Sequence, residues 1–291
     1  MNIVVIPCFD RPEFLQVTLE LISKADNYKN YLYLFQCDYG FDLKNIEVIE
    51  NFDAVKVINK TKFTGYREGK QSYNVLSGII TAAQHTKELV FLIEDDVFVG
   101  KDYFTFHEEL HKKETNIFCS ILAKNHNMIN DYEKINNENY YYINSENHYQ
   151  GIGTTFKKDI IKKYIQKHFN VEYFKNVTLY CKKDFKGLDG WGMEQDGLIR
   201  RILTVSKLKT AFAHVPRCYH AGWYSYHRGK KLKMTFDKKV NEIKNIAFNK
   251  EKMKQINNYF EHYINDSEPC NLITKHTELK EYTKKVINNL A

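Results

Sequence analysis

The stretch NIVVIPCFDRPEFLQVTLELI, residues 2–22, decides the fold class of this 291-residue chain. It opens with a short run of β-branched residues, which is typical of a buried strand. The apolar residues of its second part recur near helical spacing: Phe14, Leu15, Leu19 and Ile22. Pro12 suits the first turn of such a helix. The stretch therefore predicts a strand, a tight connection that carries Asp10 and Arg11, and a helix.

The same alternation continues along the first third of the chain. Further strand-like runs are YLYLFQC (31–37), AVKVI (54–58) and ELVFLI (88–93), and a second helix is expected over 70–85. Strands that alternate with helices predict a parallel, doubly wound sheet, which binds ligands beyond the carboxyl ends of its strands. Polar residues gather at those ends: Asp10, Arg11, Asp38, Glu94, Asp95 and Asp96.

Composition indicates a globular protein. With 43% hydrophobic residues the chain can bury a core as one large or two small domains. It starts on an apolar run without a secretory signal pattern, and no segment reaches the roughly 18 apolar residues that span a bilayer. We therefore expect a cytoplasmic protein, in a bacterium or in a virus-infected host cell. The six cysteines form no CxxC pair, so reduced thiols are expected rather than a zinc knuckle or a disulfide framework.

The positive charge is concentrated in two windows. Residues 157–186 hold nine Lys against three acids, and residues 228–254 hold ten Lys or Arg against three acids. Since the formal net charge of the chain is +7, the remainder is slightly acidic. Such asymmetry suits a polyanionic partner such as nucleic acid, or an anionic membrane surface. A solvated helix face in a lysine-rich protein explains it equally well.

Three consecutive carboxylates, Glu94, Asp95 and Asp96, follow the run at 88–93. Adjacent like charges repel, so the cluster costs stability unless a positive group lies among them. At the carboxyl edge of a sheet, a hard cation such as Mg²⁺ or Mn²⁺ meets that need. The alternative is that the acids cap a following helix through its dipole.

Three motifs occur in order within the first 110 residues: PCFDRP (7–12) before a helix, QCDYG (36–40) and EDDVFVGKDYF (94–104). Together they resemble the nucleotide-sugar half of GT-A fold glycosyltransferases, most of all the N-acetylglucosaminyltransferase I type. The resemblance implies a Rossmann-like α/β fold with a mostly parallel sheet flanked by helices. It also implies a hexosyl- or pentosyltransferase that uses Mn²⁺ or Mg²⁺ to move a sugar from a UDP-type donor to an acceptor hydroxyl, with inversion.

The resemblance also implies roles for single residues. Asp38 is expected to read the base of the donor, and Asp96 to ligate the metal. The other positions expected near the nucleotide or its sugar are Pro7, Phe9, Arg11, Glu94 and Asp95. Outside the resemblance, GYREGK (65–70) lacks a Walker pattern but precedes a helix, so Arg67 or Lys70 is expected to touch phosphate.

Two later segments resemble the acceptor half of the same fold. In DGWGMEQDGLIRR (189–201) the usual catalytic base aligns with Gln195, which cannot accept a proton. Either the base has moved to Glu194 or Asp196, or the segment only positions the acceptor. In RCYHAGWYSYHRGK (217–230), His220 matches a metal-ligating histidine, and Arg228 is expected to close over the diphosphate.

These patterns predict a glycosyltransferase domain over 1–233, with a nucleotide-sugar half (1–110) and an acceptor half (111–233), followed by a helical extension over 234–291. Two acceptor classes compete. One is a glycan, lipid or protein hydroxyl; the other is a hydroxymethylated base in DNA, as in viral DNA modification, which would have to be flipped out of a duplex. A sugar-nucleotide-binding protein without turnover is the non-enzymatic alternative.

Overall fold

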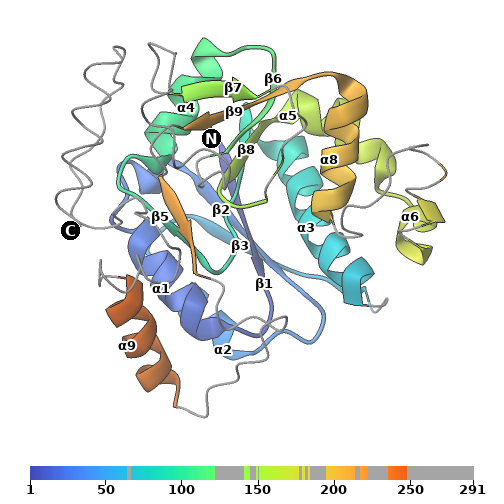
Figure 1. Ribbon diagram of the computed structural model, residues 1–291. Helices are drawn as coiled ribbons and strands as arrows, with labels where there is room; N and C mark the ends of the chain where they lie inside the picture. The colour runs from blue at the N-terminus through green and yellow to red at the C-terminus, as the bar shows by residue number, and fades with distance from the viewer. Residues whose placement is uncertain are drawn as a thin grey trace.

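The computed structural model describes residues 1–63, 67–121, 141–144, 149, 151–176, 179–180, 183, 195–213, 217–221 and 235–247. Eight strands in these ranges form one sheet in the order β3-β2-β1-β4-β8-β6-β9-β7 (Figure 1). Their bounds are β1 (Ile3–Cys8), β2 (Leu32–Cys37), β3 (Lys56–Lys60), β4 (Leu89–Leu92), β6 (Ile117–Ile121), β7 (Tyr141–Asn144), β8 (Thr154–Lys157) and β9 (Lys209–Ala213).

The first four strands form a parallel block in which β1 pairs with both β2 and β4, and β2 pairs with β3. Strand β8 then runs antiparallel between β4 and β6, and β9 returns parallel to β6. The four strands predicted from the sequence are confirmed as β1 to β4. The predicted α/β class, with a mostly parallel sheet flanked by helices, is likewise confirmed.

Helices cover both faces of the sheet, with α1, α2 and α9 on one side and α3 and α8 on the other (Figure 1). The helical elements are α1 (Pro12–Ile22), η1 (Tyr28–Asn30), α2 (Lys44–Glu50), α3 (Arg67–His85), α4 (Tyr103–Lys113), α5 (Lys158–Ile160), η3 (Ile161–Ile165), η4 (Gln166–His168), α6 (Val171–Lys175), α8 (Gln195–Ser206) and α9 (Phe236–Ala247). Both helices predicted in the first third are present, as α1 and α3. Of the predicted C-terminal extension, residues 248–291 lie outside the described ranges.

Helix α1 buries two faces. One face, with Leu15, Leu19 and Ile22, joins the main core under the sheet. The other belongs to a smaller cluster with strand β5 (Val97–Val99), the residue after β10 (Cys218–His220) and helix α9; its buried members are Phe14, Val17, Leu21, Phe98, Ala221, Val240 and Ile243. Two ion pairs, Lys239–Glu13 at 2.9 Å and Lys244–Glu20 at 2.6 Å, close this contact. Helices α1 and α9 thus support the small antiparallel sheet of β5 and β10.

Two further expectations concern the chain as a whole. Four cysteines are buried and form no disulfide within the described ranges, as predicted: Cys8, Cys37, Cys119 and Cys218. Cys181 and Cys270 lie outside the described residues. Among the helices that the structure describes, none combines the length and the apolar character that crossing a bilayer requires.

Gly153 lies in the turn before β8 with a φ of +58°, a conformation that other residues adopt with strain. A Cβ at this position would also collide with the Cys218 sulfur and meet the Tyr103 ring at 3.5 Å. We expect Gly153→Ala to lower the free energy of unfolding by about 1–3 kcal/mol, measured by urea denaturation.

Gly40 supplies the matched control. Its φ is +75°, but no atom of the described residues lies within 4 Å of an added Cβ. Gly40→Ala therefore reports the backbone strain alone, and we expect a smaller loss. Equal losses for the two variants would show that the packing of Gly153 against Cys218 contributes nothing.

Candidate active site

The three acids lie in the short connection between β4 and β5. Ile93 continues the pairing of β4 by donating to Val5 O at 3.0 Å, and Val97 N donates to Glu94 O at 3.0 Å to close a turn. The chain enters β5 directly after Asp96, and the next helix, α4, begins only at Tyr103. The alternative in which these acids cap a following helix is therefore wrong.

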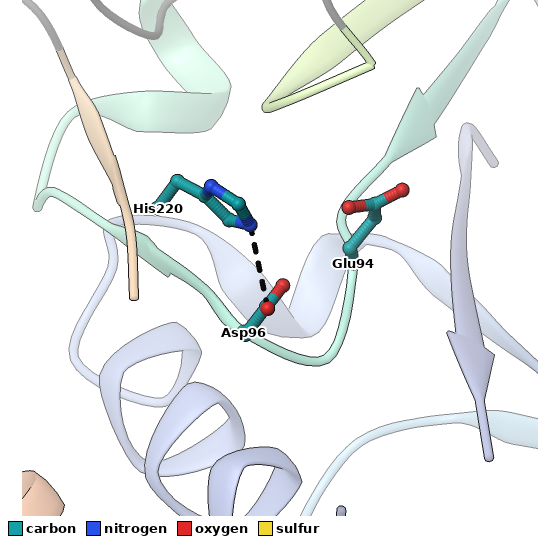
Figure 2. Close-up of side chains that lie close together, drawn as sticks. All are labelled: Glu94, Asp96 and His220. Carbon is teal, nitrogen blue, oxygen red and sulfur yellow. Dashed lines mark ion pairs between the residues drawn. The ribbon is translucent and has the colours of Figure 1, made fainter. Parts of the chain in front are cut away.

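Strand β10 brings a histidine to this connection from more than 120 residues away. It pairs antiparallel with β5, in a register that places His220 opposite Val97. Ala221 N also donates to Asp96 O at 2.8 Å. As a result His220 Nε2 lies 3.3 Å from Asp96 Oδ2 (Figure 2).

Glu94, Asp96 and His220 form a possible metal centre, in which one ligand atom from each residue lies within 4.8 Å of the others. Two carboxylates and one imidazole are donors that suit Mn²⁺, and the carboxylates also suit Mg²⁺. Asp96 Oδ1 is buried and has no hydrogen-bond partner in the described part of the chain. A buried carboxylate oxygen without a partner is costly, so these residues fit a bound cation.

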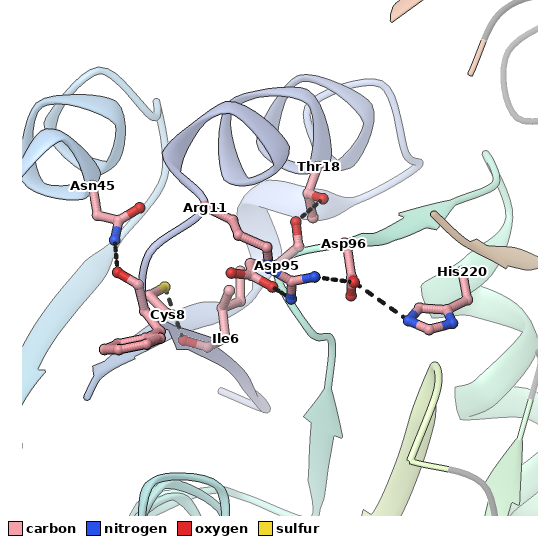
Figure 3. A network of polar contacts seen from close by, with 9 residues as sticks. Ile6, Cys8, Arg11, Thr18, Asn45, Asp95, Asp96 and His220 are labelled. Carbon is pink, nitrogen blue, oxygen red and sulfur yellow. Dashed lines mark hydrogen bonds and ion pairs between the residues drawn. The ribbon is translucent and has the colours of Figure 1, made fainter. Parts of the chain in front are cut away.

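Arg11 supplies the positive charge that the acidic cluster needs. Its guanidinium donates one N–H to Asp95 and another, at 2.5 Å, to Asp96 Oδ2 (Figure 3). The loop is further fixed by Thr18 Oγ1, which donates to Asp95 O at 2.7 Å. Arg11 therefore holds two of the three carboxylates together, a role that the prediction of a nucleotide contact did not include.

The three acids of the centre differ in the pKa of their carboxyl groups. Burial alone would raise the pKa of Asp96, but Arg11 and His220 hold it well below its usual range. Burial and the neighbouring charges of Asp96 and Asp196 raise the pKa of Glu94 to about 8. Burial raises the pKa of Asp95 to about 7, although Arg11 opposes it. Asp96 is thus the carboxylate that stays ionised throughout the physiological range.

A second group of residues gathers at the ends of β1 and β2, whose register pairs Cys8 with Cys37. Lys70 Nζ lies 3.6 Å from Asp38 Oδ2 and 4.1 Å from the centre of the Phe9 ring. Burial raises the pKa of Asp38 to about 6, against the pull of Lys70. Phe9 is 39% exposed, so the group offers a ring face, a carboxylate and an ammonium. Pro7 lies in β1 beside this group.

The structure brings these expected nucleotide contacts together and adds Lys70 as the partner of Asp38 and Phe9. The sequence signal for Lys70 was the segment GYREGK, which was predicted to precede the helix; Lys70 instead lies in the first turn of α3. Arg67 is the first residue of α3. Glu194 and Arg228 lie outside the described residues.

In the segment that was expected to contact the acceptor, Asp196 lies in the first turn of α8 and is the candidate base that the structure describes. Its negative charge is close enough to contribute to the raised pKa of Glu94. Gly151 approaches it closely, because a Cβ on Gly151 would lie 2.6 Å from Asp196 Oδ1. Gln195, which aligns with the usual base, is 98% buried and cannot accept a proton. The geometry thus leaves Asp196 as the available carboxylate in the described turn.

No family model matches this chain, and no curated protein matches it in sequence. Three solved structures resemble it at 9% identity: residues 1–349 of TarS from S. aureus, the mannosyltransferase PcManGT from Pyrobaculum calidifontis in complex with GDP-Man and Mn²⁺, and mouse xyloside xylosyltransferase 1 in its apo form.

Their TM-scores are 0.47, 0.45 and 0.44, respectively. The alignments cover 88%, 84% and 73% of this chain, and 75%, 69% and 84% of the three structures. Likenesses this remote identify neither a donor nor an acceptor nor a reaction for this chain.

Proposed function

We propose that this protein is a GT-A fold glycosyltransferase that uses a divalent cation to transfer a sugar from a UDP-type donor to an acceptor hydroxyl. One observation supports the proposal most. Glu94, Asp96 and His220 converge at the carboxyl edge of the parallel strands, and Asp96 presents a buried oxygen that has no hydrogen-bond partner among the described residues. That edge is where α/β sheets bind their ligands.

Different residues around this centre bind different parts of the donor. Glu94, Asp96 and His220 would hold Mn²⁺ or Mg²⁺, and the bound cation supplies charge neutralisation for a diphosphate leaving group. Arg11 keeps Asp96 oriented through its direct hydrogen bond. Asp38 accepts a hydrogen bond from an N–H on the edge of the base, and the exposed Phe9 ring offers it a stacking surface.

Asp196 is the proposed general base, which takes the proton from the acceptor hydroxyl as the new glycosidic bond forms. We expect Asp196→Asn to lower kcat at least 100-fold while the KM for the donor changes less than about threefold. Steady-state kinetics with the donor varied measures both constants.

The control is Asp159→Asn, because Asp159 is an exposed acid in α5, which follows β8 at the opposite end of β4 from Glu94. It should leave both constants unchanged. A large rise in the donor KM of Asp196→Asn without a loss in kcat would instead make Asp196 a donor-binding residue.

A donor screen tests the proposal. The purified chain is incubated with Mn²⁺ or Mg²⁺ and a panel of UDP-, GDP- and other nucleotide-sugars, and free nucleotide is measured with and without candidate acceptors. We expect release that requires the cation and prefers one UDP-sugar. Cation-dependent donor binding without any release would favour the non-catalytic sugar-nucleotide-binding protein, and neither binding nor release would refute the proposal.

A hydroxymethylated base in DNA is the second candidate acceptor, beside glycans, lipids and proteins. The two basic windows, 157–186 and 228–254, favour it, since lysine-rich surfaces bind phosphates. Nucleotide release that rises when hydroxymethylated DNA is added, but not with unmodified DNA, would support this acceptor.

A further inference from the structure

A cavity of about 490 Å³ lies between β3, α3 and η4; Glu94, Asp96 and His220 do not line it, and its lining residue Thr61 adjoins Asp38. We call it the α3 cavity and define it by Gln36, Asn59, Lys62, Tyr73, Ser77 and Phe169. Its volume is within the range of pockets that hold small ligands. None of the glycosyltransfer roles proposed above uses these residues.

The floor of the α3 cavity has a fixed arrangement of amide groups. Gln36 is fully buried; its Oε1 accepts from Asn59 Nδ2 at 3.0 Å, and its Nε2 donates to Ser77 Oγ at 3.1 Å. Ser77 in turn donates to Asn74 O at 3.1 Å. The orientation of the Asn59 amide is therefore set, and its carbonyl oxygen forms no hydrogen bond within the described ranges. Such an amide, with one acceptor and one donor side by side, matches the edge of a nucleobase.

One wall of the cavity is aromatic. Tyr73 and Phe169 both line it, with ring centroids 5.2 Å apart. Phe63 stacks on Tyr73 at 4.5 Å with an interplanar angle of 4°, which holds the tyrosine ring in place. Aromatic rings at a polar pocket provide a stacking surface for bases, whatever their sequence.

The rim of the cavity is positively charged. Lys62 lines it, and no acid is among the described residues that do. Lys162 and Lys163 precede the cavity residue Gln166 by one helical turn, and Lys167 follows it. All four lysines are exposed. We call them the lysine ridge.

The described part of the chain holds no ion pair for any of these four lysines, in contrast to Lys29, Lys44 and Lys70, which pair with acids. Lysines that no acid neutralises suit the phosphates of a nucleic acid. The lysine ridge and the α3 cavity thus place phosphate-binding groups beside a pocket for a base.

We propose that the α3 cavity receives an unstacked base of a nucleic-acid strand whose phosphates lie on the lysine ridge. The use of this surface to present an acceptor rests on the proposed function, but the binding itself does not. An acidic glycan would also be attracted by the lysines. A sugar ring can also pack against Tyr73 or Phe169, but the fixed donor and acceptor of the Asn59 amide match the rigid edge of a base better than hydroxyls that rotate, so we favour nucleic acid.

Fluorescence anisotropy of a labelled single-stranded 12-nucleotide DNA tests this, with the full chain in EDTA and without any nucleotide-sugar. We expect binding that weakens with salt. The triple variant K162E/K163E/K167E should bind at least 10-fold more weakly. Its salt slope, the slope of the logarithm of the binding constant against the logarithm of the salt concentration, should be smaller by about 2, because each phosphate contact on a single strand contributes about 0.7. Thr81→Trp, which fills the cavity from α3, should weaken binding about 5- to 10-fold at an unchanged salt slope.

The matched control is K101E/K112E/K113E, which reverses three exposed lysines in and before α4, and we expect it to bind within about twofold of the wild type. Equal losses for the two triple variants, no binding at low salt, or full affinity of a folded Thr81→Trp would overturn the proposal. If heparin displaces the DNA equally from Thr81→Trp and from the wild type, the surface binds acidic glycans. That result would also overturn the proposal.

One more variant separates this proposal from the proposed function. Asp96→Asn should bind the DNA as the wild type does, because Asp96 does not line the α3 cavity. A chain that binds DNA but transfers no sugar would therefore refute the enzymatic proposal alone. If the wild type transfers sugar but the ridge and cavity variants bind DNA as tightly as the wild type, the nucleic-acid proposal alone is refuted.

Discussion

Asp96→Asn should abolish cation-dependent turnover, with a loss of at least 1000-fold in kcat/KM. The substitution keeps the shape of the side chain but removes the charge that pairs with Arg11 and His220. An amide oxygen is a far weaker ligand for a hard cation than a carboxylate. Nucleotide release from the preferred donor at saturating Mn²⁺ measures the loss, and circular dichroism confirms that the chain is folded.

Two variants make this result specific. His220→Gln removes the imidazole from the same centre, so we expect weaker Mn²⁺ binding and a higher Mn²⁺ concentration for half-maximal rate. Asp53→Asn removes an exposed acid whose ion-pair partner within the described ranges is Lys29, and it should retain full activity. Wild-type turnover of Asp96→Asn would show that the cation lies elsewhere.

Arg217→Met should cost about 3–5 kcal/mol of the free energy of unfolding, the largest stability loss that we expect from any single substitution. Arg217 is fully buried; its Nε lies 3.2 Å from Asp102 Oδ2, and its guanidinium carbon lies 4.3 Å from the centre of the Phe106 ring. Removing it leaves the buried Asp102 without this cation. Its carbonyl also accepts from Gly100 N at 2.7 Å, directly before the strand that carries His220.

Urea denaturation of soluble protein measures this loss, and an exposed ion pair provides the comparison. Lys29 and Asp53 are 2.5 Å apart, but their side chains are 58% and 84% exposed. Lys29→Met should therefore leave the urea midpoint almost unchanged, because solvent screens an exposed pair. A double variant, Arg217→Met with Asp102→Leu, should recover part of the loss, because a buried pair can be replaced by apolar groups more cheaply than it can be broken. Equal losses of unfolding free energy in Arg217→Met and Lys29→Met would contradict the predicted role of burial.

Local periodicity predicted the parallel half of the fold. Residues 2–22 alone indicate β1 and α1, and alternation of the same kind placed β2, β3 and β4. The predicted acidic cluster lies where that pattern puts it, at the end of β4. These features depend on spacings of two or 3.6 residues, which a single sequence displays directly.

The remaining features depend on contacts between distant segments, which no local spacing encodes. The insertion of β8 antiparallel between β4 and β6 is one example. The pairing of β5 with β10, which brings His220 to Asp96, was not predicted, although the resemblance of residues 217–230 indicated His220 as a metal ligand. The ion pairs of Arg11 were not predicted, because the position of an arginine in the β1–α1 connection fits a ligand contact and a structural ion pair equally well.

The most direct test of the proposed metal centre is a calorimetric titration of UDP into the chain, with Mn²⁺ and then with EDTA. If Glu94, Asp96 and His220 hold the cation that receives the diphosphate, UDP should bind at least tenfold more tightly with Mn²⁺ than with EDTA. Asp96→Asn should lose that difference. Equal binding of UDP in Mn²⁺ and in EDTA, or a full Mn²⁺ effect in Asp96→Asn, would contradict the assignment.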